Sequence, residues 1–374
     1  MPYDIQISLQ KLLIGLIVVI VPLSIVGLYL TANADSSLQQ TVGMHFRTIA
    51  QYDAAAASQF IRDRIIDVST IAREPNVVDA VKASNRQYGG ISEEAIAARI
   101  QKIEGQWDTP SADSVVKAMM SSRASRWLQQ QHELNPRLLK IVVADENGAA
   151  VAATGKPIHY LEADQQRWQA VYAGGKGAVN VTDVSYDANT ESDYVEIAVP
   201  VLEEDSGRFL GAITALIDMS GLFSSLDQQR LGRTGRILLV ESSGIIVHAP
   251  NVTPDLRLKS EEFTTVHDLL GTMEGRQAGY VRAAMSSGER IVGFADTGLK
   301  RSLPNLDWLI VVSQSEREAL APVRTLERFA FLMVVLGLLM LIVLLAYFWA
   351  HREQRLADLE VIETPKPSQQ KASA

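Results

Sequence analysis

The residues of this chain that could do chemistry are scattered. The sequence has no cysteine, which excludes disulfides, thiol catalysis and thiolate metal sites. No pair of histidines has the i, i+4 spacing of a zinc site. The histidines are His45, His132, His159, His248, His267 and His351. "YAGGKGAV" lacks the glycine spacing and the Ser/Thr of a phosphate loop, no Gly-x-Ser-x-Gly elbow occurs, and nothing singles out an acid–base pair among the carboxylates. We therefore predict no enzymatic activity, no cofactor and no metal.

The composition indicates a chain that is globular, membrane-bound or both. Hydrophobic residues make up 47% of the 374 residues, and the mean hydropathy is +0.06, which is too apolar for a disordered chain. The net charge is -8, and no stretch concentrates Lys and Arg around aromatic residues. A nucleic-acid partner is therefore not expected.

Two long uncharged stretches, residues 12–34 and 329–350, are each long enough to cross a bilayer as a helix, which takes roughly 20 apolar residues. Tyr347 and Trp349 lie near the end of the second stretch, as interfacial aromatic residues do, and Arg352 follows shortly after. We predict two transmembrane helices, with both chain ends cytoplasmic.

The first stretch has an alternative interpretation. Ala32-Asn33-Ala34 has the small-x-small form of a signal-peptidase site, so the stretch could be removed as a signal peptide. A signal peptide usually has a basic segment before a shorter apolar run of about 7–15 residues, and here only Lys11 precedes a longer run beside Asp4. An uncleaved anchor is the interpretation that we favour.

The segment between these stretches begins with helical patterns. Residues 36–74 carry apolar residues at steps of three, four or seven, which predicts a long stalk helix that ends before Pro75. The apolar positions are Val42, Phe46, Ile49, Ala56 and Phe60. Asp53 interrupts this stripe. A stripe of this kind is more typical of an intramolecular core than of a dimer seam. A second helical block is predicted from residue 76 to about residue 131.

The pattern then changes to short β-rich runs separated by turns. The first predicted strands are residues 139–144, 149–153, 178–184, 194–201 and 209–217. "IVVADENG" at 141–148 aligns with "ILLVESSG" at 237–244 at an offset of 96, and the same offset carries Val195 to Ile291 and "AITALI" at 212–217 to "WLIVVS" at 308–313. We interpret this as two copies of one β-rich unit.

Each copy consists of a hairpin, a segment of about 40 residues, and further antiparallel strands, which predicts an α+β fold with helices on one sheet face. Such a sheet and its side crossover can enclose a small-ligand pocket. Gly148 would provide the positive φ that the first hairpin turn needs.

With its two spans, stalk and tandem PAS-like sheets, the chain resembles the double Cache sensor domains of bacterial chemoreceptors and sensor kinases. The stretches that carry the resemblance are "IAREPNVVDAV", "VVADENGAAVAATG", "VTDVSYDANTESDYVEIAVPV", "GAITALIDMSGLF" and "GRILLVESSGIIVHAP". The resemblance implies a membrane-distal unit that binds a ligand and a membrane-proximal unit that follows it. It covers residues 12–350.

The resemblance also implies a ligand site. The amino-acid-binding members use an Arg-x-Trp-Tyr element, a Tyr-x-Asp element and an Asp near the last strand. Trp168, Asp187 and Asp218 match the Trp and the two Asp positions. Two carboxylates in a partly dry pocket favour a bound cation, and an aromatic wall adds cation–π attraction for an ammonium group.

The remaining positions depart from that pattern. Gln166 replaces the carboxylate-binding Arg, with Arg167 one residue later; Gln169 replaces a Tyr; and Ser185 replaces the other Tyr, with Tyr186 beside it. The candidate ligand-binding residues are Trp168, Asp187, Asp218, Tyr186, Arg167 and Tyr194. We expect an amine-bearing ligand without the amino-acid carboxylate. The alternative is that Asp187 is a turn residue and Asp218 a helix cap.

These inferences give one expected organisation. Residues 1–11 form a cytoplasmic N-terminus, 12–34 and 329–350 the transmembrane helices, 35–328 the extracytoplasmic double Cache domain, and 351–374 a short cytoplasmic tail. Within the domain we expect a stalk and helical region at 36–135, a distal unit at 136–226, a proximal unit at 227–316 and a link to the membrane at 317–328.

The expected function is that of a sensor in the bacterial inner membrane. It would bind a small amine or amino-acid-like ligand in the periplasm, form a homodimer along the stalk, and signal through a separate kinase, cyclase or chemoreceptor, because the low-complexity tail "ETPKPSQQKASA" cannot form an output domain. Two alternatives remain open: a structural or assembly subunit of a membrane complex, and a ligand-delivery protein for a transporter.

Overall fold

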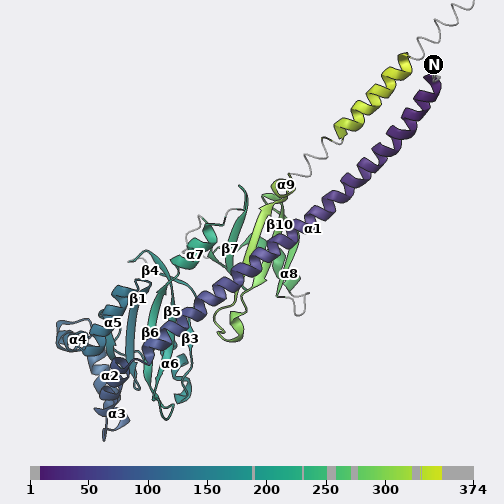
Figure 1. Cartoon of the computed structure of the whole chain (residues 1–374). Coiled ribbons are helices and arrows are strands. Elements are labelled where there is room, and N and C mark those ends of the chain that lie inside the picture. The colour runs from purple at the N-terminus through teal and green to yellow at the C-terminus, as the bar shows by residue number, and fades with distance from the viewer. Residues whose placement is uncertain are drawn as a thin grey trace, which may run out of the picture. The chain divides into compact units, whose positions relative to one another are not determined.

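The computed structural model describes residues 9–187, 190–229, 231–250, 258–270, 277–321, 329 and 331–347 (Figure 1). The chain divides into two units. One comprises Gly43–Glu316, and the other comprises Met1–Val42 with Arg317–Ala374. Within the described part of the chain, no helix has the length and apolar character that a membrane crossing requires. The predicted tail, residues 351–374, lies outside the described residues.

The described residues begin with one continuous helix, α1 (Leu9–Ala72), which includes the predicted stalk. The stalk ends two residues earlier than expected, and Pro75 is the first residue of α2, where its fixed φ and missing N–H are tolerated. The second predicted helical block consists of four α-helices rather than one. They are α2 (Pro75–Arg86), α3 (Glu93–Glu104), α4 (Asp113–Met120) and α5 (Arg123–Leu134).

The first sheet follows, with the strand order β2-β1-β6-β5-β3 and β4 paired to β5. Its strands are β1 (Leu138–Asp145), β2 (Ala150–Ala153), β3 (Asn180–Val181), β4 (Ser185–Asp187), β5 (Ser192–Leu202) and β6 (Phe209–Asp218). The predicted strand 178–184 is therefore largely irregular, and β4 was not predicted. Helix α6 (Gln166–Tyr172) precedes β3 in the chain, and helix α7 (Ser220–Asp227) follows β6.

The second sheet has the order β8-β7-β11-β10-β9, which repeats that of the first. Its strands are β7 (Arg236–Glu241), β8 (Ile246–His248), β9 (Ala278–Met285), β10 (Gly288–Asp296) and β11 (Trp308–Ser315). The helices α8 (Glu261–Leu270) and α9 (Glu316–Ala319) complete this part. The common order confirms the predicted repeat and the mixed helix-and-antiparallel-sheet fold.

The two hairpin turns are the same in detail. Gly148 has φ +78° and Gly244 has φ +87°. The Gly148 N–H donates to the Asp145 carbonyl and the Gly244 N–H to the Glu241 carbonyl, each at 2.9 Å. The sequence prediction of a positive φ at Gly148 is therefore confirmed, and Gly244 has the same conformation at the matching turn. Glycine is the residue that adopts this φ without a steric cost.

The register corrects one part of the predicted alignment. Lys140 lies opposite Leu216, while its counterpart Arg236 lies opposite Ser313. The last strand of the repeat is therefore offset by 97 residues, not 96. A slip of one residue moves every side chain of a strand to the other face. Both apolar runs are buried on both faces, so their residue pattern does not reveal such a slip, and only the strand pairing determines the offset.

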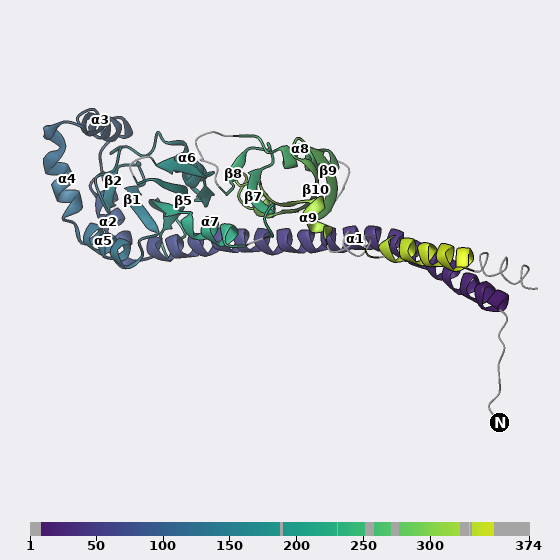
Figure 2. The ribbon, with the colours of Figure 1, turned by 90° about the horizontal axis from the view of Figure 1, so that it is seen from above.

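Figure 2 shows that α1 and α6 lie on opposite sides of the first sheet, and that α1 and α8 lie on opposite sides of the second. The buried face of α1 includes Phe46, Ala50, Ala54 and Ala57. Of the predicted apolar stripe only Phe46 lies on this face, and its other members are half-buried, so the core face is turned from the predicted one. Asp53, which interrupts that stripe, is itself only 1% exposed and accepts a 2.6 Å hydrogen bond from the Gln229 side chain. Burial raises the pKa of the Asp53 carboxyl.

Close backbone contact between α1 and β10 generates a prediction. A Cβ added at Gly293 would lie 2.5 Å from the Phe46 carbonyl carbon and 2.7 Å from the Arg47 nitrogen, both of them backbone atoms. We expect Gly293→Ala to lower the free energy of unfolding by about 2 kcal/mol, because helix and strand must separate. Urea unfolding of the full chain measures this.

The control for this variant is Gly155→Ala, since an added Cβ there meets no atom within 4 Å. It should change stability by less than about 0.5 kcal/mol. Equal stabilities of the two variants would contradict the close packing of α1 on β10.

Candidate functional site

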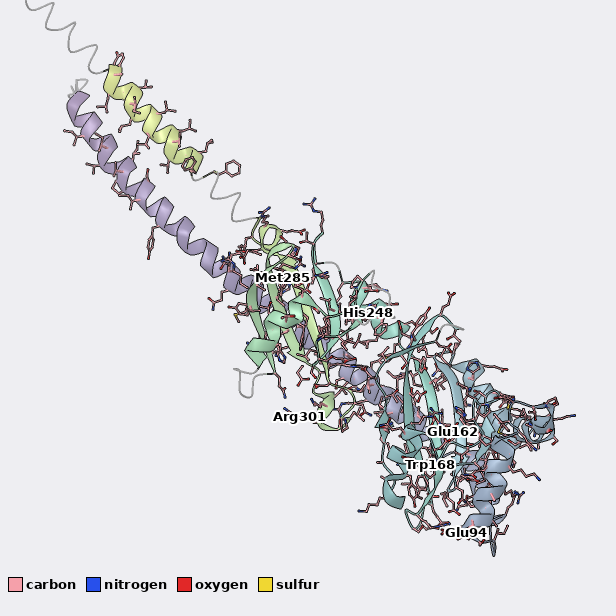
Figure 3. The ribbon with its side chains drawn as sticks, turned by 180° about the vertical axis from the view of Figure 1, so that it is seen from behind. Glu94, Glu162, Trp168, His248, Met285 and Arg301 are labelled. Carbon is pink, nitrogen blue, oxygen red and sulfur yellow. The ribbon has the colours of Figure 1, made fainter. Side chains whose placement is uncertain are left out.

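The candidate site lies on the face of the first sheet that α6 covers. The pleat of the strands sends Lys140, Tyr194 and Glu196 to the same face as Ala144 and Ala198, which pack under α6. Figure 3 labels Glu162 and Trp168 in this region. Charged side chains therefore lie on a sheet face that is otherwise mainly apolar.

Arg167 connects two acidic residues at this site. Its Nη2 lies 2.8 Å from Glu162 Oε2, and its Nη1 lies 3.5 Å from Glu196 Oε2. The Glu162 side chain is 5% exposed and that of Glu196 is 19% exposed. The guanidinium group presents a rigid set of N–H donors that can serve two carboxylates at once. Arg167 is therefore engaged by the protein's own carboxylates.

Burial sets the protonation behaviour of the site. It raises the pKa of Glu196, an effect that Arg167 opposes most strongly and Glu162 reinforces. It also lowers the pKa of Lys140, and the Glu162 carboxylate acts against that change. Burial raises the pKa of Tyr194, and the charges of Glu196 and Asp187 act in the same direction. These groups lie close enough to affect one another, so the site is one electrostatic cluster.

Trp168 is placed in the apolar part of the site and is 8% exposed. Its ring stacks on Tyr172 at a centroid distance of 5.1 Å, and Phe209 meets it edge-on at 6.0 Å. The buried residues that pack with it are Ala144, Val171, Ala198, Phe209 and Ala212. Its Nε1–H is buried and has no hydrogen-bond partner among the described residues. Trp168 is thus a core residue that retains a free donor.

Asp218 lies at the end of β6, opposite Tyr194 on β5. One Asp218 oxygen accepts from the Ser220 N–H at 2.9 Å, and the other accepts from the Ser220 hydroxyl at 2.5 Å. These bonds join Asp218 to Ser220, the first residue of α7, while the N-cap position itself is Met219.

The short strand β4 carries two further candidates. Tyr194 lies opposite Ser185 of β4, so Asp187, two residues along, shares the face of Tyr194. Tyr186 falls between them and points to the other face, where it is 38% exposed. The structure therefore brings Arg167, Tyr194 and Asp187 into one electrostatic cluster, separates Tyr186 from it, and leaves Trp168 and Asp218 at its margins.

Three residues of this cluster were not among the residues predicted from the sequence: Lys140, Glu162 and Glu196. A signal for two of them is present, because Lys140 interrupts "LLKIVVAD" and Glu196 interrupts "YVEIAVPV", two otherwise apolar strands. A charge inside a buried strand is expensive unless it has a partner, so it often marks a site. Glu162 lies in a loop and has no such signal.

The family of the chain follows from comparison with known sequences. The family model described as Cache domain, in its double Cache form, matches residues 34–323. The chain therefore belongs to the double Cache family, as the sequence motifs predicted. No curated protein matches the chain.

Solved structures similar to this chain include ligand-binding domains of bacterial chemoreceptors. That of Pseudomonas fluorescens CtaA with L-leucine is 15% identical, and the match covers 76% of this chain and 99% of that chain, with a TM-score of 0.46. That of the Pseudomonas aeruginosa PAO1 amino acid chemoreceptor PctC with GABA is 15% identical, with coverage of 72% and 97% and a TM-score of 0.44. Campylobacter jejuni Tlp3 with 4-methylisoleucine is 11% identical, with coverage of 76% and 94% and a TM-score of 0.44.

The position of Arg167 between two glutamates predicts a pH-dependent stability. In the folded chain the pKa of Glu196 is raised above its ordinary value of 4.5. The contribution of Glu196 to stability is therefore fully present below pH 4.5 and is lost as the pH rises through the raised pKa. Arg167 lowers the pKa of Glu196, so Arg167→Met should raise that pKa further and increase the loss of stability at higher pH. We expect a small destabilisation at pH 4 and about 2 kcal/mol at pH 7.5, measured by urea unfolding.

Arg99→Met provides the control, because Arg99 is exposed on α3. It should have little effect at either pH. A loss for Arg167→Met that is the same at pH 4 and pH 7.5 would contradict the proposed compensation of buried carboxylates.

Proposed function

We propose that the chain is a membrane-anchored extracytoplasmic sensor whose first sheet, as the membrane-distal unit, binds a small amine-bearing metabolite. Membership of the Cache family supports a ligand-binding sensor rather than an enzyme. The observation that carries the ligand class is the engagement of Arg167 by both Glu162 and Glu196. A ligand carboxylate would have to displace these groups.

The charge balance at the site supports the same ligand class. Two cations, Lys140 and Arg167, lie among three carboxylates, those of Glu162, Glu196 and Asp187. One negative charge is therefore in excess, before Asp218 at the margin is counted. An ammonium group would offset this excess, and the raised pKa of Glu196 indicates that burial leaves its charge incompletely compensated.

The ligand class predicts an order among matched compounds. Agmatine and cadaverine should stabilise the full chain against heat, whereas arginine and lysine, which are the same two compounds with an α-carboxylate added, should stabilise it less. At 100 times its dissociation constant a ligand adds about 2.7 kcal/mol. A thermal-shift series measures this, and Asp187→Asn should weaken amine binding about tenfold because one carboxylate is lost.

Asp164→Asn is the matched control, since Asp164 is exposed on the loop before α6. It should bind amines as the wild type does. Stronger stabilisation by arginine and lysine than by their decarboxylated amines would contradict the proposed ligand class. No stabilisation by any amine, amino acid, purine or organic acid would favour an assembly subunit.

The proposal includes membrane anchoring through residues 12–34 and 329–350, a periplasmic location for the sensor domain, and a separate signalling protein as partner. It also includes a homodimer along α1. A stripe at heptad spacing is exposed on that helix. Its residues are His45, Thr48, Tyr52, Ala55, Gln59, Arg62 and Ile66. Tyr52 is 72% exposed and Ile66 61%, so both large side chains of this stripe are accessible to a partner helix.

The absence of cysteine makes the dimer directly testable. A single Tyr52→Cys substitution should give a disulfide-linked dimer under mild oxidation, because a parallel pair of α1 helices would bring the two thiols together. Asp205→Cys, in an exposed turn between β5 and β6, should remain monomeric on a non-reducing gel. Equal cross-linking of both variants would contradict a seam along α1.

A further inference from the structure

Two adjacent residues after β3 form hydrogen bonds to different sheets: Thr182 bonds within the first sheet, and Asp183 bonds to the second. The Thr182 hydroxyl accepts from the Glu196 N–H at 3.0 Å, and the Thr182 N–H donates to the Glu196 carbonyl at 2.9 Å. Asp183 Oδ1 accepts from the indole Nε1–H of Trp308 at 2.9 Å. One residue thus holds the glutamate that pairs with Arg167, while the next bonds to the second sheet.

Trp308 is well fixed on its own side of this contact. It is the first residue of β11 and is fully buried. Its carbonyl accepts from the Thr297 N–H at 3.1 Å and from the Thr297 hydroxyl at 2.9 Å. The indole donor is therefore held in a defined position by the second sheet.

Asn305, in the turn before β11, adds a second contact of the same kind. Its side-chain N–H donates to the Asn180 side-chain oxygen and to the Val181 carbonyl, each at 3.1 Å. The turn that precedes β11 thus reaches both residues of β3. The partners of these contacts come from residues 180–183 on one side and 305–308 on the other.

The edge of the first sheet depends strongly on these contacts. Strand β3 contains two residues that pair with β5, and the two bonds of Thr182 to Glu196 extend this contact by one residue. A short edge strand has few hydrogen bonds of its own and opens easily. The same segment continues into β4, which carries Asp187.

We propose that Asp183 is a positioning residue: through Trp308, the second sheet sets the position of the segment 180–187 and hence of Glu196 and Asp187 in the ligand site. This rests on the proposed function for the site itself and adds how that site is regulated. Because coupling between two sites is reciprocal, ligand bound at Glu196 and Asp187 also stabilises the bond to Trp308 and the start of β11. Strand β11 leads directly to α9 at the end of the second sheet.

The test uses agmatine as the probe and calorimetry on the full chain. Asp183→Leu and Trp308→Phe should each weaken agmatine binding about tenfold, and the double variant should also be about tenfold weaker rather than a hundredfold, because both changes break one contact. Asp183→Asn should bind within about threefold of the wild type, since its amide oxygen can still accept from the indole N–H.

Matched controls separate positioning from general damage. Trp127→Phe, at a half-buried position on α5, and Asp205→Leu, in an exposed turn, should leave agmatine affinity unchanged. Multiplicative effects of Asp183→Leu and Trp308→Phe, or no effect of either, would overturn the proposal.

Hydrogen–deuterium exchange on the ligand-free chain gives an outcome that does not depend on the ligand. In Trp308→Phe the peptide covering residues 180–187 should exchange at least threefold faster, while the peptide covering α5 should not change. Unchanged exchange at 180–187 would overturn the positioning role even if agmatine binds. Failure of agmatine to bind the wild type, with exchange faster as expected, would overturn the ligand assignment and leave the positioning role supported.

Discussion

The site depends on the burial of two carboxylates beside one guanidinium group. Glu162 and Glu196 are both removed from most solvent, and Arg167 lies between them. Two like charges in a medium of low dielectric repel strongly, so the arrangement is stable only with a cation between them or with one carboxyl protonated. This constraint holds the Arg167 guanidinium group between the two carboxylates. It is the basis of the proposed preference for a ligand without a carboxylate.

The two sheets show how one scaffold can have different chemistry on the same face. Strand order, hairpin turns and pairing register are repeated. By that register, Lys140 corresponds to Arg236, but Glu196 corresponds to Val292. The backbone pairing requires only β-forming residues and the turn glycines, so it tolerates such changes. The acidic cluster is therefore a property of the first sheet and not of the repeated fold.

The link between the sheets includes polar side chains at the sheet edge. Trp308 donates to Asp183, and Asn305 donates to β3. Each such bond contributes little alone, but its loss leaves a buried donor unsatisfied, which costs more than the bond supplies. A contact of this type is directional, so a small shift of the β3–β4 segment changes it more than it would change an apolar contact.

The sequence by itself determined the family, the repeat and the type of fold. These depend on local signals: apolar runs of strand length, glycine at both turns and motif stretches. Tertiary structure decided that Arg167 pairs with Glu162 and Glu196, that Tyr186 points away from them and that Trp168 packs as core. It also corrected the last strand's offset and revealed β4. These features depend on strand register and on contacts between residues far apart in the chain, such as Asp183 and Trp308. Spacing along one sequence contains no information about which distant side chains will share a face, because the pairing that unites them forms only when the sheets assemble.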